Sequence, residues 1–148
     1  MTSPLRRGFR FEFEAPRGWT EEMEDGRLVY RGPRGEALTI SGLLLTGEGP
    51  SERAKEISDR LFDEAADSVN ETASDSGLVV LRPLTKDEAI ADCWTLHAET
   101  TDRKDLFAAA ICKGSSSVLL VTLEGPNAPE TLDEYDRFLR TVRAAPIH

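Results

Sequence analysis

The side chains in this 148-residue chain best suited to chemistry are Cys93, His97 and Cys112. Cys93 and His97 are four positions apart, a spacing that could indicate a thiol or metal site. Apolar and polar residues alternate around them, however, which predicts a strand with a rise of ~3.3 Å per residue. That rise separates the two side chains by roughly 13 Å, whereas zinc ligands must each lie ~2.0–2.3 Å from one ion. We therefore predict that they share no metal.

The two cysteines are predicted to face each other across a hairpin. If Thr100 lies opposite Asp105, then Cys93 lies opposite Cys112 and His97 lies opposite Ala108. Opposed residues have Cβ atoms ~4.5–5.5 Å apart, longer than the ~3.5–4.5 Å of a relaxed disulfide. In a reducing compartment we expect two thiols that pack as small apolar side chains, the alternative being a redox or metal role.

The same pairing leaves His97 without a nucleophile at hydrogen-bonding reach, because Cys93 is too far along the strand. The other neighbours of His97 on that face are Thr95, Glu99 and Ala108. We predict a histidine packed on a sheet face. No catalytic residue, cofactor or metal site is expected, and the chain is predicted not to be an enzyme.

Carboxylates are abundant, with 27 Asp and Glu against 18 Lys and Arg. Residues 51–69 have the apolar spacing of a helix. The opposite side of that helix carries an acidic row, which is the predicted protein-binding site: Glu52, Glu56, Asp59, Asp63 and Asp67. No apolar pocket is embedded in this row to raise a pKa for general acid work. A second acidic block follows Trp19 at residues 21–25, without the spacing of a calcium loop.

A net charge of −9 disfavours nucleic acid and anionic membrane surfaces, where Lys and Arg supply the affinity. It fits solubility, or a basic partner met by electrostatic steering. The first 19 residues contain no apolar run of the kind found in a signal peptide, and no stretch approaches the ~18 apolar residues of a membrane helix. We therefore expect a cytoplasmic protein.

The remaining patterns predict one α+β domain over residues 1–148, with an antiparallel sheet flanked by two main helices and the order βββαββββα. The predicted strands are 7–14, 27–31, 36–45, 78–84, 89–100, 105–113 and 117–123. Residues 118–123 are nearly all apolar, which predicts a central strand covered on both faces. The second helix is predicted to begin with Asn127 as N-cap and Pro129 in its first turn, and to be stopped by Pro146.

A resemblance rests on three motifs: the turn Pro16-Arg17-Gly18-Trp19, the strand run from Trp94 to Leu123, and the final Tyr135-x-x-Phe138-Leu139-x-x-Val142-Arg143 helix. With them the whole chain resembles the PsbP-like fold family. That family includes extrinsic photosystem proteins, a Ran-GTPase-binding import factor, DcrB-type proteins and the effector-associated (Eag) chaperones of type VI secretion. We place the chain with the bacterial DcrB and Eag-chaperone type. The resemblance implies a sheet between helices that binds proteins.

Two functions remain open from the sequence. The first is a non-catalytic, cytosolic protein-binding module that accompanies a secreted toxin or effector, as an immunity protein or an effector-associated chaperone. The second is a small-molecule-binding domain, or an undetected enzyme, with a pocket between sheet and helix near Trp19, Trp94 and His97. An immunity protein would present acidic residues to a basic toxin, whereas a chaperone for hydrophobic segments would expose an apolar groove.

Overall fold

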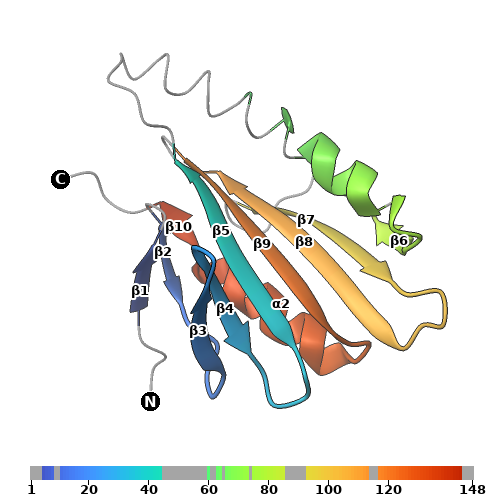
Figure 1. Ribbon diagram of the computed structural model, residues 1–148, viewed down its shortest axis with the longest axis horizontal. Helices are drawn as coiled ribbons and strands as arrows, with labels where there is room; N and C mark the ends of the chain where they lie inside the picture. The colour runs from blue at the N-terminus through green and yellow to red at the C-terminus, as the bar shows by residue number, and fades with distance from the viewer. Residues whose placement is uncertain are drawn as a thin grey trace.

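The computed structural model describes residues 5–8, 11–44, 60, 63–64, 66–73, 75–85, 93–113 and 117–144. Within these ranges the larger sheet has seven antiparallel strands in the order β3-β4-β5-β9-β8-β7-β6 (Figure 1). Its strands are Thr20–Glu24 (β3), Arg27–Arg31 (β4), Ala37–Leu44 (β5), Val79–Arg82 (β6), Cys93–Glu99 (β7), Asp105–Lys113 (β8) and Ser117–Pro126 (β9). No helix in the part of the chain described is long and apolar enough to cross a membrane.

A second, three-stranded sheet lies beside the first, with the order β1-β2-β10. Its strands are Leu5–Gly8 (β1), Phe11–Glu14 (β2) and Arg143–Ala144 (β10). The sequence-based prediction of a single strand over residues 7–14 is wrong, because the chain reverses so that Gly8 pairs with Phe11. A glycine inside a strand weakens it and is a common point of interruption.

Helical elements cover both faces of the larger sheet. Helix α2, Pro129–Thr141, packs its buried Tyr135, Phe138 and Leu139 on one face, where they join the apolar side chains of β2, β8 and β9 in a first core. Helical residues around 66–73 pack on the opposite face in a second core, which includes Leu96 and Ile111 (Figure 1). This three-layer arrangement confirms the predicted α+β class, with more strands than expected.

Strand β9 lies between β5 and β8, so it is central and covered on both sides. Leu119, Val121 and Leu123 are fully buried in the first core, and Val118 belongs to the second. A strand enclosed on both faces can be apolar at consecutive positions, which explains the run at 118–123. The predicted central strand is therefore confirmed.

Strand β3 was not predicted, because its residues were read as an acidic block. It pairs with β4 through the two-residue turn Asp25-Gly26, whose φ angles are +50° and +77°. Positive φ at both positions is the geometry of a type I′ hairpin turn, for which Asp-Gly is a preferred sequence. The block at residues 21–25 is thus an edge strand and its turn.

Both ends of α2 differ from the prediction. Ala128, not Asn127, is the N-cap residue, and no side chain caps the helix there. The Asn127 side chain instead donates to Glu99 Oε2 at 3.0 Å and to the Arg103 carbonyl at 3.1 Å. At the other end the helix stops at Thr141, before Pro146, because Arg143 and Ala144 pair with β2.

Candidate functional site

Two of the five predicted binding residues lie on the helical residues described before β6, at positions 60, 63–64, 66–73 and 75, which we call the helical segment. Glu52, Glu56 and Asp59 lie outside the described residues. Asp63 and Asp67 are exposed on helical backbone. The location of the acidic row is therefore established for two of its five predicted members, and its role in binding stays a prediction.

The row extends further than the sequence pattern predicted. We define the acidic face as five exposed carboxylates of this segment: Asp63, Glu64, Asp67, Glu71 and Asp75. At ~100° per residue they fall within an arc of roughly 120° on the helix. Ala66 and Ala73 point the other way and are buried in the second core, with 7% and 1% of their surface exposed. The acidic face is consequently the solvent side of a segment docked on the sheet.

The second acidic block, on edge strand β3, is largely occupied by neighbouring side chains. Tyr30 donates its hydroxyl to Glu21 Oε1 at 2.8 Å. Arg31 reaches Glu22 at 3.0 Å and Glu24 at 3.4 Å, and these carboxylates raise the pKa of the Arg31 guanidinium. The cross-strand pairs therefore hold these glutamates against β4.

A cavity of about 800 Å³ lies between the sheet and the end of the helical segment, and we call it the sheet–helix cavity. Ala37, Phe107 and Glu124 contribute from β5, β8 and β9, and Thr72, Ala73 and Ser76 contribute from the helical side. Its volume lies in the ~300–1,000 Å³ range of ligand pockets. Sequence patterns do not predict this cavity, because its walls come from segments far apart along the chain.

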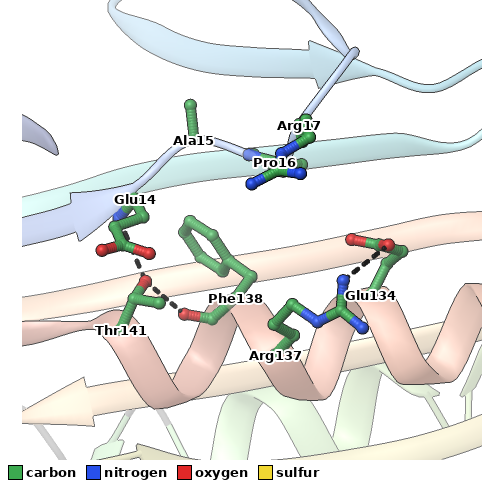
Figure 2. Close-up of a pocket in the computed structure, with 8 residues that line it drawn as sticks. All are labelled: Glu14, Ala15, Pro16, Arg17, Glu134, Arg137, Phe138 and Thr141. Carbon is green, nitrogen blue, oxygen red and sulfur yellow. Dashed lines mark hydrogen bonds and ion pairs between the residues drawn. The ribbon is translucent and has the colours of Figure 1, made fainter. Parts of the chain in front are cut away.

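A smaller cavity of about 370 Å³ separates α2 from the segment that follows β2 (Figure 2). Thr141 Oγ1 accepts the Glu14 backbone N–H at 3.0 Å and donates to the Phe138 carbonyl at 2.7 Å. Figure 2 shows Arg137 turned toward Glu134, to which it donates at 3.3 Å. These contacts close the end of α2 onto β2, and they form no nucleophile–base pair.

His97 lies on the α2 side of β7, where its ring meets the Tyr135 ring edge-on at a centroid distance of 6.1 Å. The Tyr135 hydroxyl is itself buried, 2.8 Å from Thr95 Oγ1. Desolvation by burial lowers the pKa of His97; the positive charge of Arg82 lowers it further, and the negative charge of Asp136 opposes both. Burial thus favours a neutral imidazole, packed on the sheet face as predicted.

The two cysteines form a disulfide, so the prediction of free thiols is wrong. The predicted register is correct, since Cys93 pairs with Cys112 and Thr95 with Ala110. Their Cα atoms are 4.0 Å apart, closer than the ~4.5 Å of a narrow pair in an ordinary antiparallel ladder. That close approach brings the sulfur atoms within bonding distance. The bond leaves no Cys93 thiolate for a partnership with His97.

Glu36 is a buried carboxylate that the sequence did not single out. It is 4% exposed, and its Oε1 accepts the backbone N–H of Arg34 at 2.7 Å. The carboxylate also packs so closely against Gly32 that a Cβ there would clash with it. Glu36 therefore holds the loop between β4 and β5. Among the described residues, no three His, Cys, Asp or Glu side chains are grouped to hold a metal ion.

The three described residues near which a pocket was expected, Trp19, Trp94 and His97, do not line one site. Trp19 packs against the first core, on the α2 side of the sheet. Trp94 packs against the second core, on the other side. Successive side chains of a strand point to opposite faces, which also puts Trp94 and His97 on different sides of β7. The sheet itself separates the two tryptophans.

No family model matches the sequence, and the comparison with curated proteins finds no match. Solved structures do match. A crystal structure from Bacteroides thetaiotaomicron aligns with a TM-score of 0.58 and 12% identity over 99% of this chain and 50% of that one, so this chain spans half the length of that protein. Cyanobacterial PsbP (CyanoP) from Synechocystis sp. PCC 6803 aligns with a TM-score of 0.55 and 15% identity, over 97% and 92% of the two chains.

A third match is LpqN of Mycobacterium tuberculosis, described as involved in cell envelope biogenesis. It has a TM-score of 0.51 and 13% identity over 92% of this chain and 83% of that one. At such identities the likeness concerns the fold and not the activity. The assignment to the DcrB and Eag-chaperone branch stays a prediction. The matches, taken with the seven-stranded sheet between helical layers, establish that this chain has the PsbP-like α+β fold.

Proposed function

We propose that this chain is a non-catalytic protein-binding module that engages a basic partner protein through its acidic face. The observation that carries the proposal is the acidic face itself, with its exposed carboxylates on a segment held to the sheet by buried alanines. The described part of that segment carries one cation, Arg60. A concentrated surface charge on a fixed support accelerates association with an oppositely charged partner.

Two local arrangements support a role without catalysis. Both sulfur atoms are bonded to each other, and the His97 ring packs against Tyr135. A general acid, base or nucleophile needs a neighbouring group and access to a reacting atom. Protein binding is also what the resemblance to the PsbP-like family implies.

An immunity-type partner, such as a basic toxin, fits better than a hydrophobic segment held by an effector chaperone. The large apolar side chains most exposed among the described residues are Met23, Val79 and Leu81. Met23 lies on edge strand β3 and the other two on edge strand β6, at opposite edges of the sheet. They form no shared apolar groove, which a chaperone for hydrophobic segments would need.

The proposed compartment is the cytoplasm, and the disulfide sets a condition on it. Disulfides persist mainly in oxidising compartments. Cys93 and Cys112 are both 0% exposed, so a reducing thiolate has no path to either sulfur in the folded protein. A cytoplasmic location therefore requires that the disulfide survive through burial.

The proposal is tested by affinity purification from the native host, followed by titration calorimetry with the partner that co-elutes. We expect a basic partner whose affinity falls as salt rises, because exposed charges are screened over ~8 Å at physiological ionic strength. Reversing two charges, Asp67→Lys with Glu71→Lys, should weaken binding by about tenfold or more.

The matched control reverses Glu14 and Asp133, which are exposed on β2 and α2, on the α2 side of the sheet. It makes the same change in net charge and should leave the affinity close to that of the unmodified protein. Equal loss in both double variants would indicate a general effect of net charge. An acidic partner, or full affinity in the Asp67 and Glu71 variant, would end the proposal.

A further inference from the structure

The sheet–helix cavity begins where the acidic face ends. Thr72, Ala73 and Ser76 line the cavity, and Glu71 and Asp75 of the acidic face adjoin them on the same segment. A partner drawn to the acidic face would therefore lie beside the opening. Charge alone gives rate and orientation more than affinity, which comes from a few side chains buried in well-shaped pockets.

The positive and negative side chains around the cavity differ in whether they form ion pairs. Arg31 is paired with Glu22 and Glu24, and Arg34 lies 3.9 Å from Glu130. Asp105 and Glu124 also line the cavity, and neither has an ion pair with another described residue. The unpaired charge at the opening is thus negative, which favours cationic groups on whatever enters.

The interior of the cavity is suited to an apolar group. Phe107 and Leu78 are half-buried there and belong to the rim of the second core, and Ala37 and Ala73 add small side chains. Covering such partly exposed apolar surface is favourable at ~25 cal/mol per Å². A cavity of about 800 Å³ has room for one aromatic side chain together with the backbone on either side of it.

We propose that the sheet–helix cavity receives one large apolar side chain, aromatic or leucine-like, from a basic segment of the partner. Lysines or arginines on either side of that side chain meet Glu124, Asp105 and the acidic face. This inference rests on the proposed function and adds to it the residue pattern by which the partner is recognised: an apolar anchor within a cationic stretch.

Two fluorescein-labelled peptides serve as probes: Gly-Lys-Lys-Phe-Lys-Lys-Gly, and the same peptide with alanine in place of phenylalanine. Fluorescence anisotropy measures their binding to the full chain. The two peptides carry the same charge, so the ratio of their affinities isolates the anchor. We expect the phenylalanine peptide to bind about tenfold more tightly or better, which is the effect of burying one such side chain.

A variant that fills the cavity supplies the second measurement. Ser76→Trp places a large side chain at the cavity wall, at an exposed position. Ser68→Trp is the matched control, because Ser68 is exposed on the same segment and is not among the residues that line the cavity. We expect the affinity ratio to fall to about one in Ser76→Trp and to stay at its original value in Ser68→Trp.

The outcomes separate this inference from the function on which it rests. If both peptides bind equally, or if Ser76→Trp leaves the ratio unchanged, the anchor proposal is wrong. In that case, a weaker affinity of the alanine peptide for the Asp67→Lys, Glu71→Lys variant would still support the acidic face as the binding surface. Suppose instead that the phenylalanine peptide binds more tightly than the alanine peptide, but that the Asp67→Lys, Glu71→Lys variant binds both as tightly as the unmodified protein. The acidic face is then not the binding surface, and the proposed anchor in the cavity is supported. Binding of neither peptide overturns both.

Discussion

The side-chain amide of Asn70 pairs with both backbone groups of Leu84. Its Nδ2 donates to the Leu84 carbonyl and its Oδ1 accepts the Leu84 N–H, each at 3.0 Å. Asn70 is on the helical segment and Leu84 follows strand β6, so the amide acts as a short piece of strand that ties the two together. The acidic face is held in place by this pair and by the alanines beneath it.

The first prediction concerns that pair. Asn70→Ala leaves the N–H and C=O of Leu84, a residue only 4% exposed, without their partner. We expect the free energy of unfolding to fall by about 1–3 kcal/mol, the cost of unpaired buried polar groups. Urea denaturation measures it. Ser68→Ala, at an exposed position nearby, should change stability by less than ~0.5 kcal/mol, and an equal effect in both variants would contradict the anchoring role.

The second prediction is a loss of stability at high pH that depends on Tyr135. Burial raises the pKa of its phenol, and the negative charge of Asp136 adds to the rise, while the hydrogen bond with Thr95 opposes it. The unfolded chain releases this proton near the ordinary pKa of ~10, so stability is full below that pH and declines above it. Tyr135→Phe should show a shallower decline in thermal melts above pH ~10. Identical pH profiles would contradict the prediction.

The third prediction is the acid counterpart, at His97. Its pKa is lowered by burial in the folded state, so the unfolded chain takes up the proton first as the pH falls. The stability that the neutral ring contributes is present above the ordinary pKa of ~6.5 and is lost progressively below it. His97→Gln should lose less stability between pH ~7 and ~5 than the unmodified protein. A ring titration followed by NMR must show a midpoint below ~6.5, and a higher midpoint would refute the argument.

The fourth prediction concerns the disulfide. Cys93 and Cys112 are 19 residues apart, and a loop of this size stabilises a protein by about 3 kcal/mol, mainly by restricting the unfolded chain. Replacing both with alanine should reduce the free energy of unfolding by about that amount. Reductant should have little effect on the folded protein, because both sulfurs are fully buried, and should act after unfolding in urea.

The same bond tests the cytoplasmic location. Protein purified from a reducing cytosol is unfolded in the presence of an alkylating agent and weighed by mass spectrometry. Survival of the disulfide gives an unlabelled chain. A chain labelled at both cysteines would show that cytosolic protein does not form the bond, and the proposed cytoplasmic location would then be wrong.

Local patterns were sufficient for the part of the fold built from neighbouring strands. The register of β7 with β8 is confirmed from Cys93 opposite Cys112 to Ala98 opposite Phe107. It could be predicted because a short loop fixes the pairing: the Thr100 N–H donates to the Asp105 carbonyl at 3.0 Å, and the Thr100 hydroxyl donates to Asp102. Once one pair is known, the period of two fixes every other pair in the hairpin.

The features that the sequence did not predict depend on a turn within an acidic stretch or on contacts between residues distant in sequence. Asp25-Gly26 was available as a hairpin signal, but the surrounding glutamates obscured the strand. Spacing could not predict that Asn127 bonds to Glu99 and Arg103 instead of capping α2, because those partners are distant in sequence. Nor could it predict the disulfide, which depends on how closely Cys93 and Cys112 approach across the hairpin. The sheet–helix cavity joins four segments of the chain, residues 31–37, 72–78, 100–107 and 124–126, and no local pattern encodes such a space.

Strand β10 pairs Arg143 with Glu12 and Ala144 with Phe11, partners more than a hundred residues apart in the sequence. During synthesis Arg143 emerges more than a hundred residues after Glu12, so one edge of β2 has no neighbour until β10 has been made. Pairing across such a separation is slow, because the whole intervening chain must first be brought together. The nascent chain therefore carries an open β-strand edge until α2 and β10 have emerged, and a chaperone that covers Phe11 and Phe13 would protect it during that interval.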